Sequence, residues 1–127
     1  GKRRTPSLVA KYASEYNTPF VSPEGFGALV NVVKDACLEI GRNPEDLTYS
    51  CAQVFCCGES EAIFTDRASA IGRDPDELRS NGLAGTPDEV LNRIERFKEE
   101  GCERFYLQIL DDRDLEHLEL AAEIISK

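Results

Sequence analysis

Three cations stand side by side at the start of the chain, in a setting that suits an anion. Lys2, Arg3 and Arg4 follow Gly1 and precede Thr5, which with the next residue, a proline, has the pattern of a helix start. Free backbone N–H groups at a helix N-terminus, the helix dipole and guanidinium groups together favour a phosphate. On the residues alone, a phosphate site and a solvated basic terminus both remain open.

A charged loop and a single hydroxyl are the other candidate sites. Asp111, Asp112, Arg113 and Asp114 join an apolar run to a final helix, and Arg113 among three carboxylates could orient a substrate or cofactor group. Asp114 is equally a natural N-cap, and a charged loop is commonly only solvated. Ser22 could donate a hydrogen bond into a site, although its place before a proline is explained by helix capping.

Cysteine and histidine do not form a recognisable catalytic or metal-binding set. The cysteines lack paired C-x-x-C spacing and mostly lie in apolar runs, which predicts reduced, small core residues. They are Cys37, Cys51, Cys56, Cys57 and Cys102. His117 is the only histidine, and its polar neighbours early in the final helix predict an exposed side chain. We therefore expect no catalytic residue and no metal ligand in this segment.

The composition indicates an ordinary globular protein with an acidic surface. Hydrophobic residues make up 41% and charged residues 31% of the 127 residues, and the formal charge is −9. That charge disfavours nucleic acid and anionic membrane surfaces as partners. No secretion signal or long apolar run is visible, so we expect a cytoplasmic protein.

The elements that must position these residues alternate between helix and strand. The capping box at 86–89 and the apolar spacing elsewhere predict helices over about 6–15, 22–41, 59–71, 86–101 and from 115 onward. Apolar runs predict strands over 19–21, 47–57 and 104–110. The glycine-punctuated stretch 72–85 is expected to be a lid or an irregular excursion.

This alternation predicts an α/β fold with about three parallel strands and flanking helices. A closed barrel of eight such strands needs about 250 residues, so we expect roughly half of one here. The chain contains no methionine, even at position 1, which also suggests a longer parent. In such folds the reactive face lies beyond the carboxyl ends of the strands, which favours the chain start, 22–25, 57–59 and 111–114. Asn17, at the opposite end of its expected strand, should be structural.

Two segments resemble the luciferase-like flavin and deazaflavin oxidoreductases. Their glycine-rich phosphate loop, helix and following turn resemble GKRRTPSLVAKYASEYN, and their seventh helix and eighth strand resemble GLAGTPDEVLNRIERFKEEGCERFYLQIL. The resemblance runs through nearly the whole chain in the same order. It implies the C-terminal part of a (β/α)8 TIM barrel. Residues 1–127 would form one partial domain, from the end of the strand-5 loop through the last helix.

The same resemblance implies where ligands would lie. It maps the family's cofactor phosphate onto residues 1–5 and places Ser22 and Arg113 near the substrate pocket. The complete enzyme would move a hydride between a deazaflavin coenzyme, or FMN, and a small organic substrate. The flavin ring rests mainly on the first four strands in this family, so this segment alone is expected to be inactive.

Two alternatives stay open for the function. One is an FMN-dependent monooxygenase that uses oxygen. The other is a non-catalytic fragment that associates with copies of itself, because three parallel strands leave unpaired edges and an uncovered apolar inner face. A self-contained receiver-like or flavodoxin-like module fits less well, since those folds begin with a strand and have about five of them.

Overall fold

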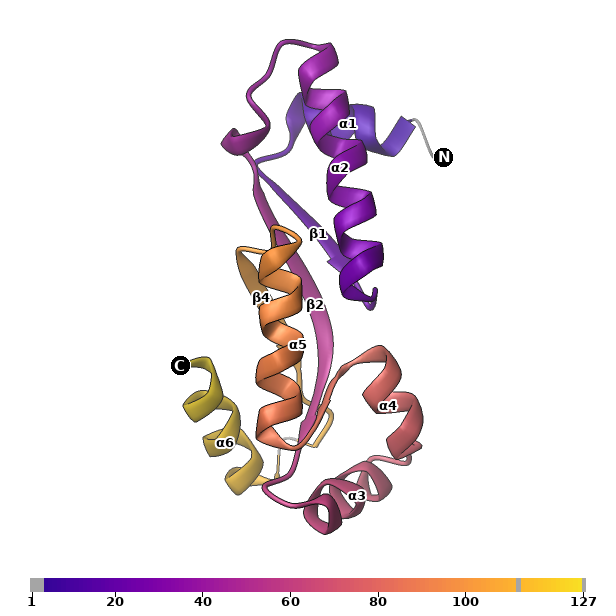
Figure 1. Ribbon diagram of the computed structural model, residues 1–127, viewed down its shortest axis with the longest axis vertical. Coiled ribbons are helices and arrows are strands. Elements are labelled where there is room, and N and C mark those ends of the chain that lie inside the picture. Colours follow the sequence, from indigo (N-terminus) through magenta and orange to yellow (C-terminus); the bar gives the residue numbers. More distant parts are fainter. Residues whose placement is uncertain (1–3, 112, 127) are drawn as a thin grey trace.

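The computed structural model describes residues 4–111 and 113–126, with the side chains of 6–111, 113–124 and 126. A parallel sheet lies at its centre and helices pack against it, most of them on one face (Figure 1). The strands are β1 (Glu15–Pro19), β2 (Thr48–Cys57), β3 (Leu83–Gly85) and β4 (Arg104–Gln108). The helices are α1 (Arg4–Tyr12), α2 (Pro23–Glu39), α3 (Glu61–Ala70), α4 (Pro75–Asn81), α5 (Pro87–Glu99) and α6 (Leu115–Ile125), with the 3-10 turn η1 (Pro44–Asp46) before β2.

The long strand β2 organises the sheet. It pairs in parallel with β1 over residues 48–52, with β4 over 50–54 and with β3 over 55–57. Because helices separate the strands along the chain, each connection can return to the same end of the sheet, as parallel pairing requires. The expected parallel α/β architecture is confirmed. Among the described residues, β1 and β4 each pair only with β2, so each leaves one free edge.

Strand β1 lies earlier than the apolar run that was expected to form it. It covers Glu15–Pro19 and not 19–21, and α1 ends at Tyr12 and not near residue 15. The prediction was wrong because the strand alternates: Tyr16 and Thr18 turn toward the helices while Glu15 and Asn17 turn away. Asn17 lies mid-strand and its amide donates to the Ser50 hydroxyl at 2.9 Å, which is a structural role.

The stretch 72–85 also proved more ordered than expected. It contains helix α4 and the three-residue strand β3, so the described sheet has four strands and not three. Strand β3 is too short to show a two-residue period. Its residues Leu83, Ala84 and Gly85 are all buried. Asp74 caps α4 by accepting from the Asp76 N–H at 3.2 Å.

Most of the core lies on one face of the sheet. Tyr49, Cys51, Phe55 and Cys57, at alternate positions of β2, face α2, α5 and α6 and join their apolar side chains in one cluster. Phe26 of α2 meets Phe97 of α5 edge to face, with ring centroids 6.0 Å apart. We call this side of the sheet the helix-covered face. All five cysteines are buried and none forms a disulfide, which confirms their place in the core.

The other side, which we call the open face, carries Glu15, Asn17, Ser50, Ala52, Val54, Arg104, Tyr106 and Gln108. Helices α3 and α4 cover it only toward the carboxyl ends of the strands, where Phe64 and Leu78 pack on Val54 and Cys56. Asn17, Arg104 and Gln108 are exposed. No described helix is long and apolar enough to cross a membrane.

The open face is polar, which corrects the expected apolar inner surface. Glu15 accepts from Arg104 Nη1 at 2.8 Å, from the Tyr106 hydroxyl at 2.9 Å and from the Ser50 hydroxyl at 3.0 Å. The hydrogen bonds from Tyr106 and Ser50 lower the pKa of Glu15, and so does the charge of Arg104. These side chains satisfy one another, so this part of the surface is hydrogen-bonded and not bare hydrocarbon.

Candidate functional site

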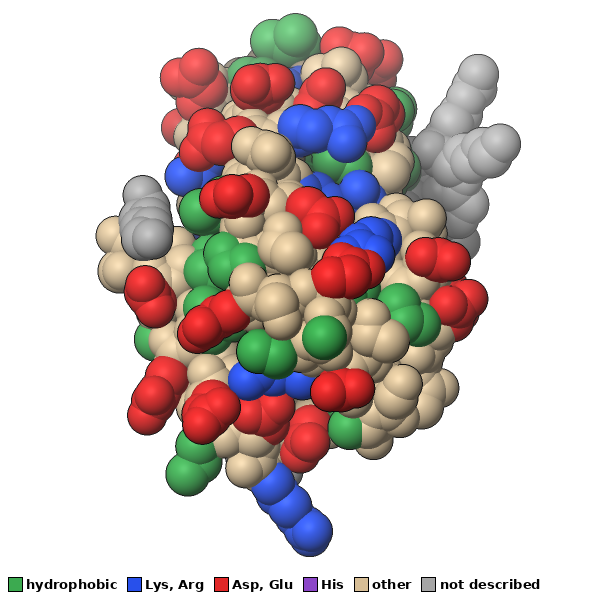
Figure 2. Space-filling view, turned by 60° about the horizontal axis from the view of Figure 1, so that its bottom comes forward, with side chains coloured by type: hydrophobic (Ala, Val, Ile, Leu, Met, Phe, Trp, Pro, Cys, Tyr) green, Lys and Arg blue, Asp and Glu red, His purple; other side chains and the backbone are tan. Residues whose placement is uncertain are grey.

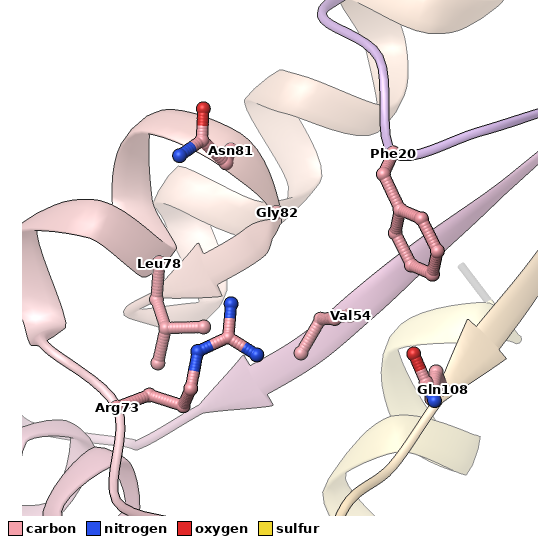
Figure 3. A pocket seen from close by; sticks show the side chains of 7 residues that line it. All are labelled: Phe20, Val54, Arg73, Leu78, Asn81, Gly82 and Gln108. Atoms are coloured by element: carbon pink, nitrogen blue, oxygen red, sulfur yellow. The ribbon is translucent and has the colours of Figure 1, made fainter.

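A cavity of about 200 Å³ lies on the open face at the carboxyl ends of β1 and β4 (Figure 3). Polar and apolar groups from several elements line it: Phe20, Val54, Arg73, Leu78, Asn81, Gly82 and Gln108. In Figure 3 the Phe20 ring and the Arg73 guanidinium lie on either side of Val54, while Asn81 points away. Its position matches the edge where parallel α/β proteins build their sites, so we treat this cavity as the candidate site.

Phe20 enters this cavity from a strained backbone. Its φ of 56° is in the left-handed region, which bulky residues rarely occupy, and it is the only non-glycine residue with positive φ in the described chain. A hydrogen bond from the Phe20 N–H to the Ala52 carbonyl, 2.9 Å long, fixes this conformation. The ring remains 57% exposed, so core packing does not explain the strain. Strain of this kind is typical of functional sites.

Gly82 lets the opposite wall of the cavity approach the sheet. A Cβ at this position would lie 2.8 Å from the Val54 carbonyl oxygen, which is too close for any other residue. The Gly82 N–H bonds to the Leu78 carbonyl at 2.8 Å and ends α4. Arg73, just before that helix, pairs with Glu77 at 3.2 Å and supplies the only cationic side chain among the lining residues described.

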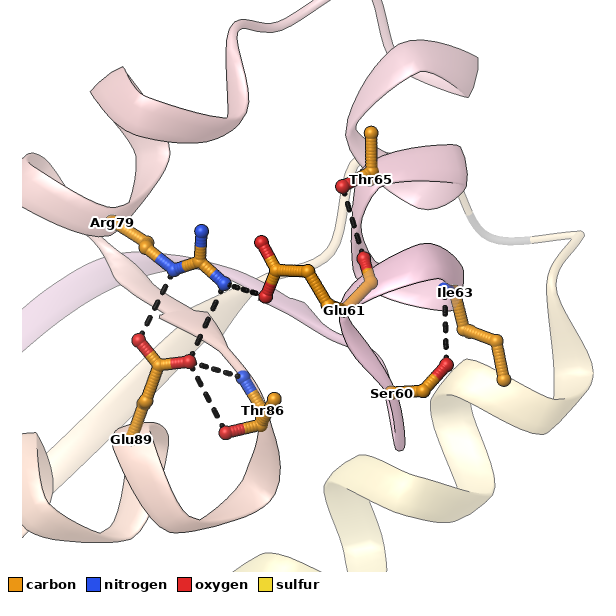
Figure 4. A network of polar contacts seen from close by, with 7 residues as sticks. All are labelled: Ser60, Glu61, Ile63, Thr65, Arg79, Thr86 and Glu89. Atoms are coloured by element: carbon orange, nitrogen blue, oxygen red, sulfur yellow. Dashed lines mark hydrogen bonds and ion pairs between the residues drawn. The ribbon is translucent and has the colours of Figure 1, made fainter.

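Two ion pairs of Arg79 hold α4 over the sheet, next to the capping box that begins α5 (Figure 4). Arg79 pairs with Glu89 of α5, Nε to Oε2 at 3.1 Å, and with Glu61 of α3. Its guanidinium also stacks 4.6 Å from the Phe64 ring. Glu89 closes the expected capping box by accepting from the Thr86 N–H at 3.2 Å. Sequence reasoning found the capping box but not Arg79, whose partners lie 10 and 18 residues away.

A second polar cluster joins the end of β2 and helix α3 to the start of α6. Arg67 donates through Nε to Asp114 at 2.8 Å and through Nη1 to the Cys57 carbonyl at 2.8 Å. His117 Nε2 accepts from the Cys57 N–H at 3.0 Å, and its ring stacks on Phe55 with centroids 4.9 Å apart. The cluster therefore fixes the carboxyl end of β2 relative to the last helix.

His117 is buried, with 4% of its surface exposed, so the expected exposed position was wrong. The sequence did contain the signal: residues 117, 120, 121 and 124 recur at helical spacing, and all four are buried. Burial lowers the pKa of His117, with a further contribution from Arg67. The neutral ring is therefore favoured, as an acceptor at Nε2 requires.

The two residues expected to contact substrate do not line the cavity. The Ser22 hydroxyl accepts from the Gly25 N–H at 3.0 Å and caps α2. Arg113 is exposed, and its backbone N–H donates to Asp111 at 3.1 Å. Asp114 caps α6 as expected, accepting from the His117 N–H at 3.1 Å. A substrate role for Ser22 and Arg113 stays a prediction.

The expected phosphate site falls mostly outside the described residues. Gly1, Lys2 and Arg3 lie outside them, and Arg4 and Thr5 are described only as the backbone that begins α1. Binding of a cofactor phosphate there also stays a prediction.

The end of the molecule that carries the carboxyl ends of the strands is largely acidic. Figure 2, turned so that this end comes forward, shows acidic side chains over much of the surface, with basic ones interspersed. Acidic residues also line a hollow of about 410 Å³ between α3 and α6, namely Glu59, Glu116, Glu119 and Glu123. That hollow repels an anion such as a phosphate.

Solved structures share this arrangement. One is an F420-dependent secondary alcohol dehydrogenase in complex with an F420–acetone adduct, which superposes with a TM-score of 0.78 at 15% identity. The match covers 98% of this chain and 46% of the dehydrogenase chain. The described fold therefore matches about half of a TIM-barrel chain of this kind. The coenzyme F420-dependent tetrahydromethanopterin reductase of Methanopyrus kandleri superposes with a TM-score of 0.72 at 14% identity, over 95% of this chain and 47% of the reductase. The oxygenating constituent of 3,6-diketocamphane monooxygenase from Pseudomonas putida, in complex with FMN, superposes with a TM-score of 0.64 at 18% identity. That match covers 96% of this chain and 43% of the monooxygenase chain.

This chain spans about half the length of these luciferase-like proteins, as the expected partial barrel requires. Neither a protein-family model nor a curated protein matches its sequence. At these identities the likeness establishes the fold, and with it the expected α/β barrel architecture.

This cavity is too small to hold a cofactor of the F420 or FMN kind by itself. The cavity of about 200 Å³ is smaller than the roughly 300–1,000 Å³ of usual ligand and cofactor pockets. Of the lining residues, only Arg73 could pair with a phosphate, and Glu77 already pairs with it. This cavity could therefore form only one wall of a cofactor site.

Proposed function

We propose that this chain is part of a cytoplasmic luciferase-like oxidoreductase that moves a hydride between a deazaflavin coenzyme and a small organic substrate. The observation that carries the proposal is the cavity at the carboxyl ends of β1 and β4, in a fold shared with two F420-dependent enzymes. In this proposal the cofactor performs the redox chemistry, and residues 1–5 bind its phosphate.

The cavity would form the substrate-facing wall of the complete site. Phe20 offers an aromatic surface, Gln108 an amide, and Arg73 a cation beside them. This combination suits a small substrate with an apolar body and an anionic or hydrogen-bond-accepting group. Because Glu77 already pairs with Arg73, the substrate group would compete with that carboxylate for the guanidinium.

Cofactor binding tests the proposal directly. A protein with all eight strands is titrated with F420 and, separately, with FMN, while the fluorescence of each is followed. We expect quenching by F420, with this 127-residue chain as the matched control that gives none. Quenching by neither cofactor would overturn the proposal, and quenching by FMN alone would replace the deazaflavin.

Substrate contacts are tested by steady-state kinetics of the same complete protein. Arg73→Gln should raise KM by about tenfold while kcat changes little, and Arg73→Lys should restore part of the loss. Arg113→Gln is the matched control outside the cavity. If Arg113→Gln raises KM and Arg73→Gln does not, the substrate lies at the α6 loop and not in this cavity.

A second candidate is an oxygen-using, FMN-dependent monooxygenase, favoured by the likeness to the oxygenating constituent of 3,6-diketocamphane monooxygenase, whose structure contains FMN. The two proposed reactions differ in their oxidant, which is oxygen for the monooxygenase and the deazaflavin for the dehydrogenase. Substrate-dependent oxygen consumption by the FMN-loaded complete protein supports the monooxygenase, and anaerobic turnover with F420 supports the dehydrogenase.

A third candidate is a non-catalytic piece that associates with copies of itself. The free edges of β1 and β4 present unpaired N–H and C=O groups, which favour strand addition. Light scattering of the 127-residue chain should then show a homo-oligomer. A stable, folded monomer over a range of concentrations contradicts it.

A further inference from the structure

Two thiols on neighbouring strands lie side by side in the core. Sγ of Cys51, on β2, is 3.7 Å from Sγ of Cys102, which precedes β4, although 51 residues separate them. Cys51 is fully buried and Cys102 is 5% exposed. The proposed oxidoreductase function uses neither residue, because they lie on the helix-covered face and the cavity lies on the open face.

The backbone holds this pair in register. The Glu103 N–H donates to the Tyr49 carbonyl at 2.8 Å, and the next residue, Arg104, begins the paired part of β4. Sγ of Cys102 also lies 3.3 Å from the Arg104 carbonyl oxygen. A disulfide needs an S–S separation of about 2.05 Å, so the sulfurs must approach by less than about 2 Å. Small side-chain rotations can supply that movement without separating the strands.

The other described cysteines are less well placed. Cys56 and Cys57 are adjacent in β2 and face opposite sides of the sheet, since Cys57 belongs to the helix-covered cluster and Cys56 to the cluster under α3 and α4. A bond between them would need a strained ring. Cys37 lies on α2 in the same core as Cys51, which makes it the natural control.

We propose that Cys51 and Cys102 form an oxidisable dithiol that hydrogen peroxide converts to a disulfide. The Cys102 thiolate attacks the peroxide O–O bond, forms an S–O bond and releases one oxygen, which leaves as water. The Cys51 sulfur then attacks the Cys102 sulfenic sulfur, the S–S bond forms and the S–O bond breaks, releasing a second water. Two thiols are oxidised, one hydrogen peroxide is reduced, and both thiol protons end in water.

The environment distinguishes the two sulfurs. The hydrogen bond between the two thiols lowers the pKa of Cys102, while the same contact and burial raise the pKa of Cys51. Cys102 is also the more exposed of the two. Cys102 is therefore the attacking group, and Cys51 resolves the sulfenic acid.

The bond would fasten β4, an edge strand, to the centre of the sheet. It would close a loop of about 50 residues. A cross-link across such a long loop lowers the conformational entropy of the unfolded chain and so stabilises the folded one. The cross-link sits near the amino ends of β2 and β4, away from the cavity. We therefore expect a higher melting temperature of the chain and no change in ligand binding at the carboxyl edge.

The test is made on the 127-residue chain with limited hydrogen peroxide, alkylation of free thiols and peptide mapping. Digestion with chymotrypsin is suitable because cleavage after Phe55 separates Cys51 from Cys56 and Cys57. We expect a linked pair of peptides carrying Cys51 and Cys102, an intact mass reduced by two hydrogens, and reversal of both by dithiothreitol. The melting temperature should rise by several degrees on oxidation and fall again on reduction.

Cys51→Ala and Cys102→Ala should each abolish the cross-link, and Cys37→Ala should keep it. A Cys56–Cys57 bond, a Cys37-containing bond, or sulfinic acid at Cys102 without any linked peptide would overturn the proposal. If either alanine variant fails to fold, mapping of the unmodified sequence before and after dithiothreitol still decides the outcome.

Discussion

His117 of α6 accepts a hydrogen bond at Nε2 from the backbone N–H of Cys57, at 3.0 Å, so the last helix holds the end of the central strand. A protonated imidazole has no acceptor, so this contact exists only while the ring is neutral. The ring stacks on Phe55 and is almost completely buried. The charges around it are Arg67 from α3 and Asp111 and Asp114 from the loop before α6.

The stability of the chain should therefore depend on pH through this residue. Burial holds the pKa of His117 below its ordinary value of 6.5, so the unfolded chain takes up the proton first as the pH falls. The contribution of neutral His117 to the free energy of unfolding is complete above about pH 6.5, and it is lost as the pH falls below that value. Urea midpoints measured between pH 8 and pH 5 should decline for the wild type. His117→Gln, whose amide oxygen can accept without titrating, should flatten that decline, and an equally steep decline would contradict the assignment.

Arg67→Met should destabilise the chain by about 2–3 kcal/mol, because it removes a hydrogen bond to the Cys57 carbonyl and leaves Asp114 unpaired. Chemical denaturation measures the loss. The matched control is Arg73→Met, whose pair with Glu77 is exposed and should be worth less than about 0.5 kcal/mol. Equal losses in the two variants would show that the Arg67 cluster is not a structural link.

Gly82→Ala should cost about 2 kcal/mol or more, because the new Cβ would lie 2.8 Å from the Val54 carbonyl oxygen and push α4 from the sheet. Gly41→Ala tests a different cause, since nothing lies within 4 Å of its Cβ position but its φ is +74°. Backbone strain alone should cost about 1 kcal/mol there. A loss at Gly82 no larger than that at Gly41 would count against the close approach of α4.

Phe20→Asn should stabilise the chain by about 0.5–1 kcal/mol, because asparagine tolerates the left-handed backbone at φ 56° and the lost ring is mostly exposed. Thermal unfolding checks the sign. In the complete protein the same change should weaken substrate binding, and Leu8→Asn, another exposed apolar residue, is the control that should not. Unchanged or lower stability of Phe20→Asn would mean that the ring contributes more packing than strain costs.

Local signals predicted much of the fold. Proline after a capping residue located the starts of α2 and α5, and Asp114 was recognised as the cap of α6. Apolar runs located β2 and β4. The starts of these elements are set by groups within a few residues of each other, which is why one sequence suffices to find them.

Long-range partners account for what was missed. Most residues of strand β1 are exposed or half-buried, so its sequence carries little strand signal. It is a strand because β2 pairs with it. The cavity depends on Phe20, Arg73 and Gln108, which are far apart in the chain and carry no motif. The polar neighbours of His117 in the sequence indicate an exposed side chain, whereas its helical spacing with residues 120, 121 and 124 indicates burial.

The ion pair between Glu15 and Arg104 joins two strands that never touch. Strands β1 and β4 flank β2, so their backbones are separated by two strand spacings, roughly 10 Å. A 2.8 Å contact between their side chains on one side only draws that side together. Such a contact favours bending of the sheet toward those side chains, which is the curvature that the wall of a cylinder needs.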